Sequence, residues 1–200
     1  MVPRRICKMK LTREFYLQDG LTVARELIGK KLVTNLPEGL TSGIIVETEA
    51  YMGTIDAAAH SYRGKTERTK IFYGAGGFVY VYLIYGKNFC TNVVANLENV
   101  PEAVLIRALQ PVDGVDLMKR RRNKKNLREL CSGPGKLSQA LGVTKSFYGA
   151  DLCGDKIFIE IVENFQADII STKRINVDYA GDAADYPWRF IAAGNNFLSK

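Results

Sequence analysis

Alternating apolar and polar positions predict that strands outnumber helices along this chain. The clearest strand begins at Ile44, where three β-branched residues follow Gly43, and it ends before Gly53. Further strands are expected over 31–36, 78–85, 89–94, 103–109 and 156–162, with a strand, a loop and another strand over 169–197. Helices are expected over 15–29, 56–60, 113–126 and 136–141. Few β-α-β units occur, so we predict an α+β fold: one domain over residues 1–200, with a curved, open-barrel-like antiparallel sheet, surrounding helices and a flexible basic arm at residues 1–13.

The strand that begins at Ile44 carries polar side chains that an apolar strand does not need. Alternation places Glu47, Glu49 and Tyr51 on one face. One interpretation is an edge strand with a solvated acidic face, a common way to protect the edge of a sheet. The other is a site in which a carboxylate faces a reacting atom and aromatic side chains form the walls.

The composition favours a polyanionic partner. Lys and Arg number 28 against 21 Asp and Glu, which gives a formal net charge of +7. No apolar run reaches the ~18 residues of a transmembrane helix, and the basic N-terminus lacks the apolar stretch of a secretory signal. We therefore expect a cytoplasmic protein without a membrane partner.

Cysteine spacing argues against a metal site. The four cysteines, Cys7, Cys90, Cys131 and Cys153, are far apart, and the single histidine cannot complete the usual Cys/His zinc sets. We expect reduced thiols, no metal and no cofactor.

Six tyrosines occur from Tyr51 to Tyr85, and five of them form the group of interest: Tyr51, Tyr73, Tyr80, Tyr82 and Tyr85. Core packing is one explanation, although a buried tyrosine needs a partner for its hydroxyl group. With nearby carboxylates, one histidine and a basic surround, the cluster also suits a pocket that sandwiches a planar ring, as in an enzyme that acts on a base swung out of duplex DNA. Two alternatives remain open: a nucleic-acid-binding module without activity, and a carbohydrate hydrolase that uses the two acids as a pair.

Six segments, in this order, resemble the alkyladenine (3-methyladenine) DNA glycosylase family. They read IVETEAYMG, DAAAHS, YVYLIYGKNFCTNVV, VLIRAL, ELCSGPGKLSQAL and RINVDYAG, and the resemblance runs from Phe15 to the C-terminus. It implies a monofunctional base-excision-repair enzyme, a monomer, that flips alkylated or deaminated purines (3-methyladenine, 7-methylguanine, hypoxanthine, ethenoadenine) out of double-stranded DNA. Hydrolysis of the N-glycosidic bond leaves an abasic site. The expected location is the nucleoid in a bacterium or the nucleus in a eukaryote.

The resemblance also implies roles for individual residues. Glu49 matches the general base that activates water, a role that strand alternation alone could not assign to it rather than to Glu47. Arg107 matches the arginine that helps to hold this water beside the carbonyl of Val177. Side chains that match the base-binding and intercalating positions are Tyr51 on one face of the base, His60 and Tyr82 on the other, Asn92 against the amino group of normal guanine, and Tyr85 as the wedge in the duplex.

Basic residues around these motifs are expected to contact DNA phosphates. They are Arg63, Lys65, Arg68, Lys87, Lys119, Arg120 and Lys136. Lys136 opens a predicted helix after Gly133-Pro134-Gly135, where free amide groups could hold a phosphate. The chain departs from the family pattern at Lys87 and Asn88, at 73–75, and at Asn176, where a glycine is typical.

Overall fold

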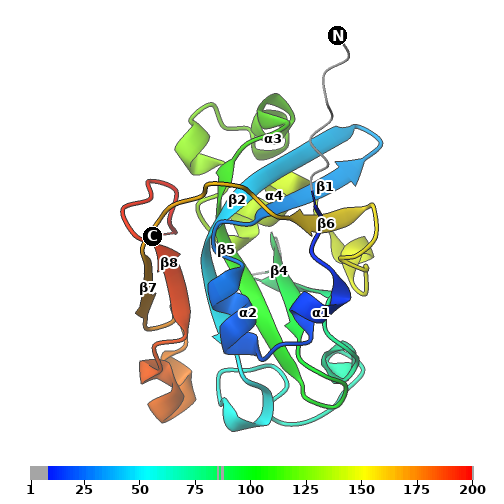
Figure 1. The fold of residues 1–200 in the computed structure, drawn as a ribbon, viewed down its shortest axis with the longest axis vertical. Helices are drawn as coiled ribbons and strands as arrows, with labels where there is room; N and C mark the ends of the chain where they lie inside the picture. Colours follow the sequence, from blue (N-terminus) through cyan, green and yellow to red (C-terminus); the bar gives the residue numbers. More distant parts are fainter. Residues whose placement is uncertain (1–8, 85, 87, 200) are drawn as a thin grey trace.

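The computed structural model of this protein describes residues 9–84, 86 and 88–199, and its body is one antiparallel sheet (Figure 1). The eight strands are β1 (Lys31–Leu36), β2 (Gly39–Tyr51), β3 (Val79–Ile84), β4 (Asn88–Ala95), β5 (Glu102–Pro111), β6 (Ile157–Glu160), β7 (Ile169–Thr172) and β8 (Arg189–Ala192). The main path runs β3-β4-β5-β2-β1-β6, while β8 pairs with both β2 and β7. The sheet is not closed into a barrel, so the predicted α+β class with an open curved sheet is confirmed.

Strand β2 lies in the middle of the sheet and organises it. Along one edge it pairs with β5; along the other it pairs first with β1 and then, from Glu47 to Glu49, with β8. The edge-strand interpretation is therefore wrong, because both sides of β2 are hydrogen-bonded. The register with β5 shifts on both sides of Glu47, which leaves Val46 and Arg107 without direct partners. Such irregularities often occur next to active sites, where they adjust the direction of a side chain.

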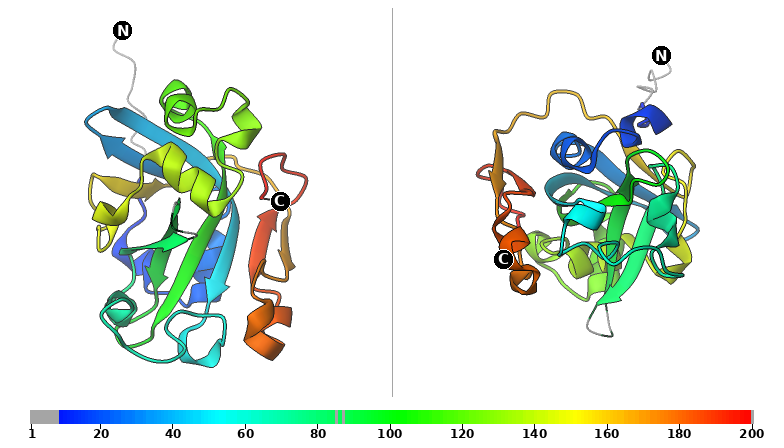
Figure 2. Two further views of the ribbon diagram at one scale, coloured as in Figure 1. Left: turned by 180° about the vertical axis from the view of Figure 1, so that it is seen from behind. Right: turned by 90° about the horizontal axis from the view of Figure 1, so that it is seen from below.

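The α-helices are short and cover both faces of the sheet. They are α1 (Arg13–Tyr16), α2 (Gly20–Glu26), α3 (Val115–Arg122) and α4 (Pro134–Leu141). Helix α2 packs on β2, where the hydroxyl group of Thr48 donates to the carbonyl of Ala24. Helix α4 crosses the opposite face, as the view from behind shows (Figure 2). Since side chains alternate along a strand, Glu47, Glu49 and Tyr51 point to the face covered by α4 and away from α2.

Several predicted helix boundaries were wrong. The segment 15–29 divides into α1 and α2, because the side chain of Asp19 caps a new helix by accepting from the amides of Leu21 and Thr22. The basic helix expected over 113–126 is shorter, since Gly114 and Asn123, which flank α3, both have left-handed backbone angles.

The short helix expected over 56–60 is absent. Asp56 ends the 3-10 turn η1 (Gly53–Ile55), and its carboxylate accepts from the amides of Met52 and Ala58. These bonds replace the helical ladder, and His60 lies in the following turns.

The flexible arm expected over 1–13 does not extend to its last residues. Lys10 pairs with Glu160, Leu11 is buried and Arg13 opens α1. Residues 1–8 lie outside the described part of the chain, as do Tyr85 and Lys87. Among the described residues, no helix has the length and apolar character needed to cross a membrane.

Candidate active site

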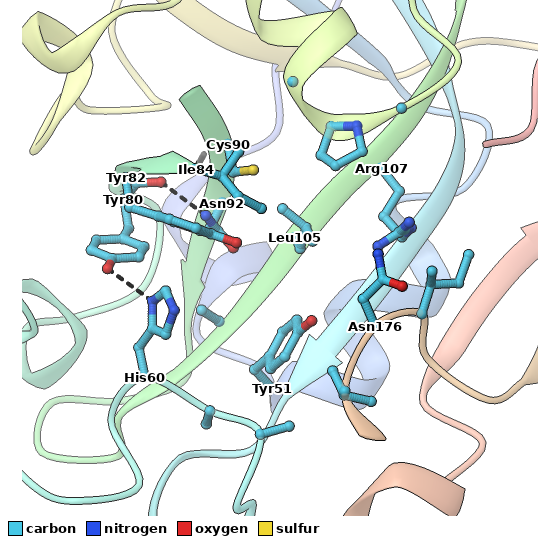
Figure 3. Close-up of a pocket in the computed structure, with 18 of the residues that line it drawn as sticks. Tyr51, His60, Tyr80, Tyr82, Ile84, Cys90, Asn92, Leu105, Arg107 and Asn176 are labelled. Atoms are coloured by element: carbon cyan, nitrogen blue, oxygen red, sulfur yellow. Dashed lines mark hydrogen bonds between the residues drawn. The ribbon is translucent and has the colours of Figure 1, made fainter. Parts of the chain in front are cut away.

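A cavity of about 560 Å³ lies beside the face of β2 to which Tyr51 points. Its lining comes from β2, β3, β4 and β5, from the turn around His60, from the start of α4, and from the segment 175–179 (Figure 3). The size is that of a pocket for a small planar ligand. Seven of the predicted site residues line it: Tyr51, His60, Tyr82, Asn92, Arg107, Lys136 and Val177.

Aromatic rings form one wall of this cavity. Tyr80 and Tyr82 stack with their ring centroids 5.6 Å apart and their planes at 27°, and His60 packs edge-on against Tyr82 at 4.6 Å. The ring of Tyr51 approaches from β2, on the other side of the cavity (Figure 3). A slot bounded by aromatic faces suits a flat, electron-poor ring.

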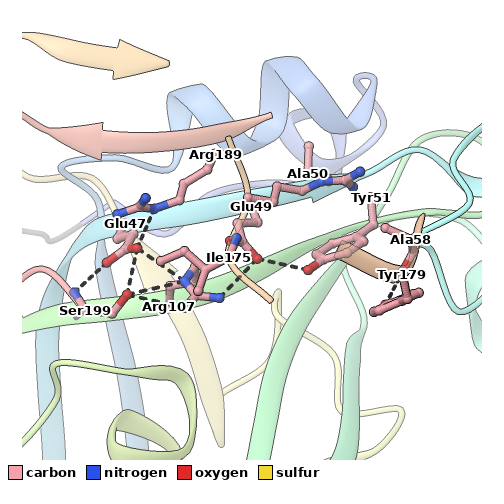
Figure 4. A network of polar contacts seen from close by, with 11 residues as sticks. Glu47, Glu49, Ala50, Tyr51, Ala58, Arg107, Ile175, Tyr179, Arg189 and Ser199 are labelled. Carbon is pink, nitrogen blue, oxygen red and sulfur yellow. Dashed lines mark hydrogen bonds and ion pairs between the residues drawn. The ribbon is translucent and has the colours of Figure 1, made fainter. Parts of the chain in front are cut away.

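Glu49 lies directly behind the lining and is fully buried. Its Oε2 accepts from the hydroxyl group of Tyr51 at 2.9 Å and from Nη1 of Arg107 at 3.2 Å (Figure 4). Its Oε1 accepts from the backbone amide of Ile175 at 2.8 Å. Three donors thus surround the carboxylate, and all three belong to residues that line the cavity.

Glu47 is also fully buried, and of its three partners Arg107 and Ser199 line the cavity while Arg189 does not. Its Oε1 accepts from Nε of Arg189 at 2.7 Å and from Nε of Arg107 at 3.2 Å. Ser199 donates to the same carboxylate through its backbone amide and its hydroxyl group (Figure 4). The two acids therefore differ in their partners: Glu49 bonds to Tyr51 and Ile175, whereas Glu47 bonds to Arg189 and Ser199. This difference separates two residues that strand alternation alone could not distinguish.

Burial and charge shift the pKa values of the groups around Glu49. Burial alone would lower the pKa of Arg107, but the carboxylates of Glu49 and Glu47 outweigh it and raise that pKa. Burial, with the charge of Glu49, raises the pKa of Tyr51 well above its ordinary value. Arg107 therefore stays charged at neutral pH, and Tyr51 stays protonated and donates to Glu49.

His60 is electrically neutral at neutral pH. Burial of the ring, and then the positive charge of Arg68, lower its pKa from 6.5 to about 4. Arg68, which we expected at a DNA phosphate, lies with its guanidinium against the aromatic wall, 2.9 Å from the hydroxyl group of Tyr80. Its phosphate contact stays a prediction.

The other basic residues lie on the surface, and one of them reaches the cavity. Lys136, in the first turn of α4, lines the cavity beside Gly135 and is exposed. Arg63, Lys65 and Arg120 are exposed, while Lys119 is paired with Asp116 in the same helix. The intercalating Tyr85 and the basic Lys87 cannot be placed, since both lie outside the described residues.

Sequence reasoning missed several parts of the site. The sequence alone does not decide whether Tyr80 packs in the core or faces the pocket. Its alternation with Tyr82 along β3 favours the pocket, and Tyr80 does line the cavity. Ile175 and Ser199 gave no signal, because Ile175 acts through its backbone amide and Ser199 bonds to a residue 152 positions away. A buried ion pair between Arg174 and Asp56, beneath Tyr51, was also not anticipated.

Comparison with known proteins agrees with the resemblance. A family model described as methylpurine-DNA glycosylase (MPG) matches residues 14–196. A protein of Alkaliphilus oremlandii is 48% identical over 201 residues, which cover 96% of this chain and 100% of that protein. Proteins of Desulfitobacterium hafniense (46% identical; 95% of this chain, 98% of that one) and Bacillus cytotoxicus (47%; 96% and 100%) are similarly close. All three carry the name "Putative 3-methyladenine DNA glycosylase".

The match covers almost the whole chain. Each of the six segments quoted above contributes residues to the lining of the cavity. The chain thus belongs to the methylpurine-DNA glycosylase family, and it is a monofunctional DNA glycosylase of base excision repair.

Proposed function

We propose that this enzyme removes alkylated or deaminated purines, among them 3-methyladenine, 7-methylguanine, hypoxanthine and ethenoadenine, from duplex DNA after flipping the nucleotide into the cavity. The observation that carries the proposal is the position of Glu49. A buried carboxylate, oriented by Tyr51 and Arg107, adjoins a cavity of about 560 Å³ with aromatic rings in its wall. The names of the three relatives support the same class of substrate.

The slot provides the first layer of selection. Flipping costs a few kcal/mol and costs least for damaged, poorly paired bases. A purine alkylated at N3 or N7 is positively charged, so it gains from stacking between Tyr51 and Tyr82. Asn92 is buried in the cavity wall, where its amide donates to the carbonyl of Tyr80. In that position it obstructs the exocyclic amino group of normal guanine.

Glu49 performs the chemistry. As the bond from C1′ to the base nitrogen lengthens, the sugar gains positive charge that the carboxylate stabilises. A water molecule enters beside Arg107 and Val177, gives a proton to Glu49 and attacks C1′. The base leaves with the bonding electrons and an abasic site remains. Glu47 bonds to Arg107, Arg189 and Ser199, and we assign it the role of holding Arg107 in position.

Duplex DNA is held by the basic surface around the cavity. Lys136 and the free amides at the start of α4 lie at the cavity lining, where they bind a phosphate of the flipped nucleotide. Arg63, Lys65, Lys119 and Arg120 add phosphate contacts. Tyr85 follows Ile84, which lines the cavity, so we assign it to the gap left by the flipped base.

The decisive experiment measures base release from duplexes that carry a single 3-methyladenine, hypoxanthine or ethenoadenine. We expect the wild type to release base and Glu49→Gln to be slower by a factor of about 10² to 10⁴ while it still binds the duplex. The exposed Glu98→Gln serves as the matched control and should retain full activity. Binding by the wild type without release of any base would favour a nucleic-acid-binding module instead.

A further inference from the structure

Three side chains from separate segments meet at the edge of the aromatic wall. Tyr80 comes from β3 and is 1% exposed, Arg68 from the loop after His60, and His60 from the turns that follow β2. The hydroxyl oxygen of Tyr80 lies 2.9 Å from Nε of Arg68 and 2.9 Å from Nδ1 of His60 (Figure 3 shows the second contact).

The chemistry of these groups fixes the direction of both hydrogen bonds. Nε of Arg68 carries a hydrogen and can only donate, so the oxygen of Tyr80 accepts from it. The hydroxyl hydrogen of Tyr80 is buried and requires an acceptor. Among the described residues, the hydrogen-bond partners of this oxygen are Arg68 and His60, and only His60 can accept. Nδ1 of His60 is therefore the acceptor.

Arg68 also contacts the ring of His60 directly, and this contact keeps the imidazole uncharged. Its Nη2 lies 3.3 Å from Nδ1 and 3.4 Å from Nε2 of His60. Nearly equal distances to both ring nitrogens place this atom over the face of the ring, since an in-plane position would bring it too close to the carbon between them. A cation over the ring opposes a second positive charge on it. A neutral imidazole that accepts at Nδ1 carries its hydrogen on Nε2.

We propose that Arg68 is a positioning residue that fixes the tautomer of His60. Through Tyr80 it holds Nδ1 as an acceptor, so that the cavity presents Nε2–H as a permanent donor; Figure 3 shows this second nitrogen on the side of the ring turned toward Tyr51. The occupant selected by this arrangement bears an oxygen or an unprotonated nitrogen on the edge that meets His60. A base with an amino group at that position would place one donor against another.

The identification of the occupant as a purine rests on the proposed function. The assignment of the tautomer of His60 does not. Hypoxanthine has an oxygen at position 6 where adenine has an amino group. Arg68 therefore contributes to the preference for hypoxanthine over adenine without touching either base.

The chain has one histidine, so its ring nitrogens can be observed without assignment. We would record long-range proton–nitrogen correlation spectra of the ¹⁵N-labelled protein between pH 5 and 8. In the wild type we expect the Nε2–H tautomer throughout. Arg68→Met and Tyr80→Phe should both give a mixture of tautomers, and the exposed Arg25→Met, in α2, should behave as wild type. An Nδ1–H tautomer in the wild type, or an unchanged spectrum in Arg68→Met and Tyr80→Phe, would overturn the inference.

A second measurement connects the tautomer to selectivity. The ratio of release of hypoxanthine to release of adenine should fall by about tenfold in Arg68→Met and stay unchanged in Arg25→Met. An unchanged ratio in a folded Arg68→Met variant would contradict the selective role. If the wild type released no base while its spectrum showed the Nε2–H tautomer, the proposed function would fail and the assignment of the tautomer would stand.

Discussion

The backbone amide of Ser199 donates to Oε2 of Glu47 at 2.6 Å, although the two residues are 152 positions apart in the sequence. The hydroxyl group of Ser199 donates to the other oxygen of the same carboxylate at 2.8 Å and accepts from Arg107 at 3.4 Å. The final segment of the chain therefore helps to orient the arginine that contacts Glu49.

Removal of this hydroxyl group should lower activity more than it lowers stability. In Ser199→Ala, Arg107 loses one of the acceptors that direct its guanidinium toward the cavity. We expect base release to slow by about tenfold and the free energy of unfolding to fall by about 1 kcal/mol. Single-turnover kinetics and urea unfolding measure the two effects. Ser199→Thr keeps the hydroxyl group and should retain most of the activity; equal loss in both variants would contradict this role.

The ion pair of Asp56 with Arg174 should be important for stability. Both side chains are fully buried; Nη2 of Arg174 donates to Oδ1 at 2.8 Å, and the guanidinium lies 4.9 Å from the ring of Tyr51. Asp56→Asn leaves a buried charge without its counter-charge, so we expect a loss of about 3–5 kcal/mol in urea unfolding. In Asp185→Asn, which removes an exposed ion pair with Lys173, the loss should be below about 1 kcal/mol. Similar losses in the two variants would show that the buried ion pair contributes no more to stability than the exposed one.

Protonation of His60 should destabilise the fold in acid. The pKa of His60 is about 4 in the folded protein and near 6.5 when the chain is unfolded. Between these values the unfolded state binds more protons, so the free energy of unfolding rises with pH in this window. The contribution is complete above pH 6.5 and is lost as the pH falls toward 4. Urea titrations at several pH values should show a smaller slope for His60→Gln than for the wild type; an identical slope would contradict the lowered pKa.

Lys136 should contribute to affinity for DNA in a way that depends on salt. If its ammonium group contacts a phosphate, Lys136→Gln should reduce the slope of log K against log salt concentration by about 1. The effect should be the same for damaged and undamaged duplexes, since phosphate contacts carry no sequence information. Lys145→Gln, in the 3-10 turn Lys145–Phe147 that follows α4, is the control. An unchanged slope in Lys136→Gln would remove the helix start from the DNA interface.

Asn176 should be replaceable by glycine. Its φ angle is +60°, a left-handed value that glycine adopts freely and asparagine tolerates. Asn176→Gly should therefore change the free energy of unfolding by less than about 1 kcal/mol, whereas the β-branched Asn176→Val should lose about 1–2 kcal/mol. Thermal unfolding of the three proteins compares them directly. The left-handed angle thus explains why an asparagine is tolerated here, and an unchanged unfolding temperature in Asn176→Val would argue against this.

The sequence by itself determined the strands, their alternation and the family. The patterns around β1, β2, β3 and β5 are local properties of the chain, and β1 was predicted to the residue. The common face of Glu47, Glu49 and Tyr51 follows from the period of two in a strand. Helix ends were less predictable, because single side chains such as Asp19 and Asp56 bond to the backbone and redirect it.

Only the tertiary structure decided what surrounds each of the two acids. Glu47 and Glu49 are equivalent in any local pattern, and they differ because Ser199 and Arg189 approach one of them while Tyr51 and Ile175 approach the other. The same holds for Arg68. The sequence predicts that it contacts a phosphate, and only the fold shows that its guanidinium lies against the aromatic wall. Contacts between distant segments depend on how the whole sheet brings them together, and no local pattern records them.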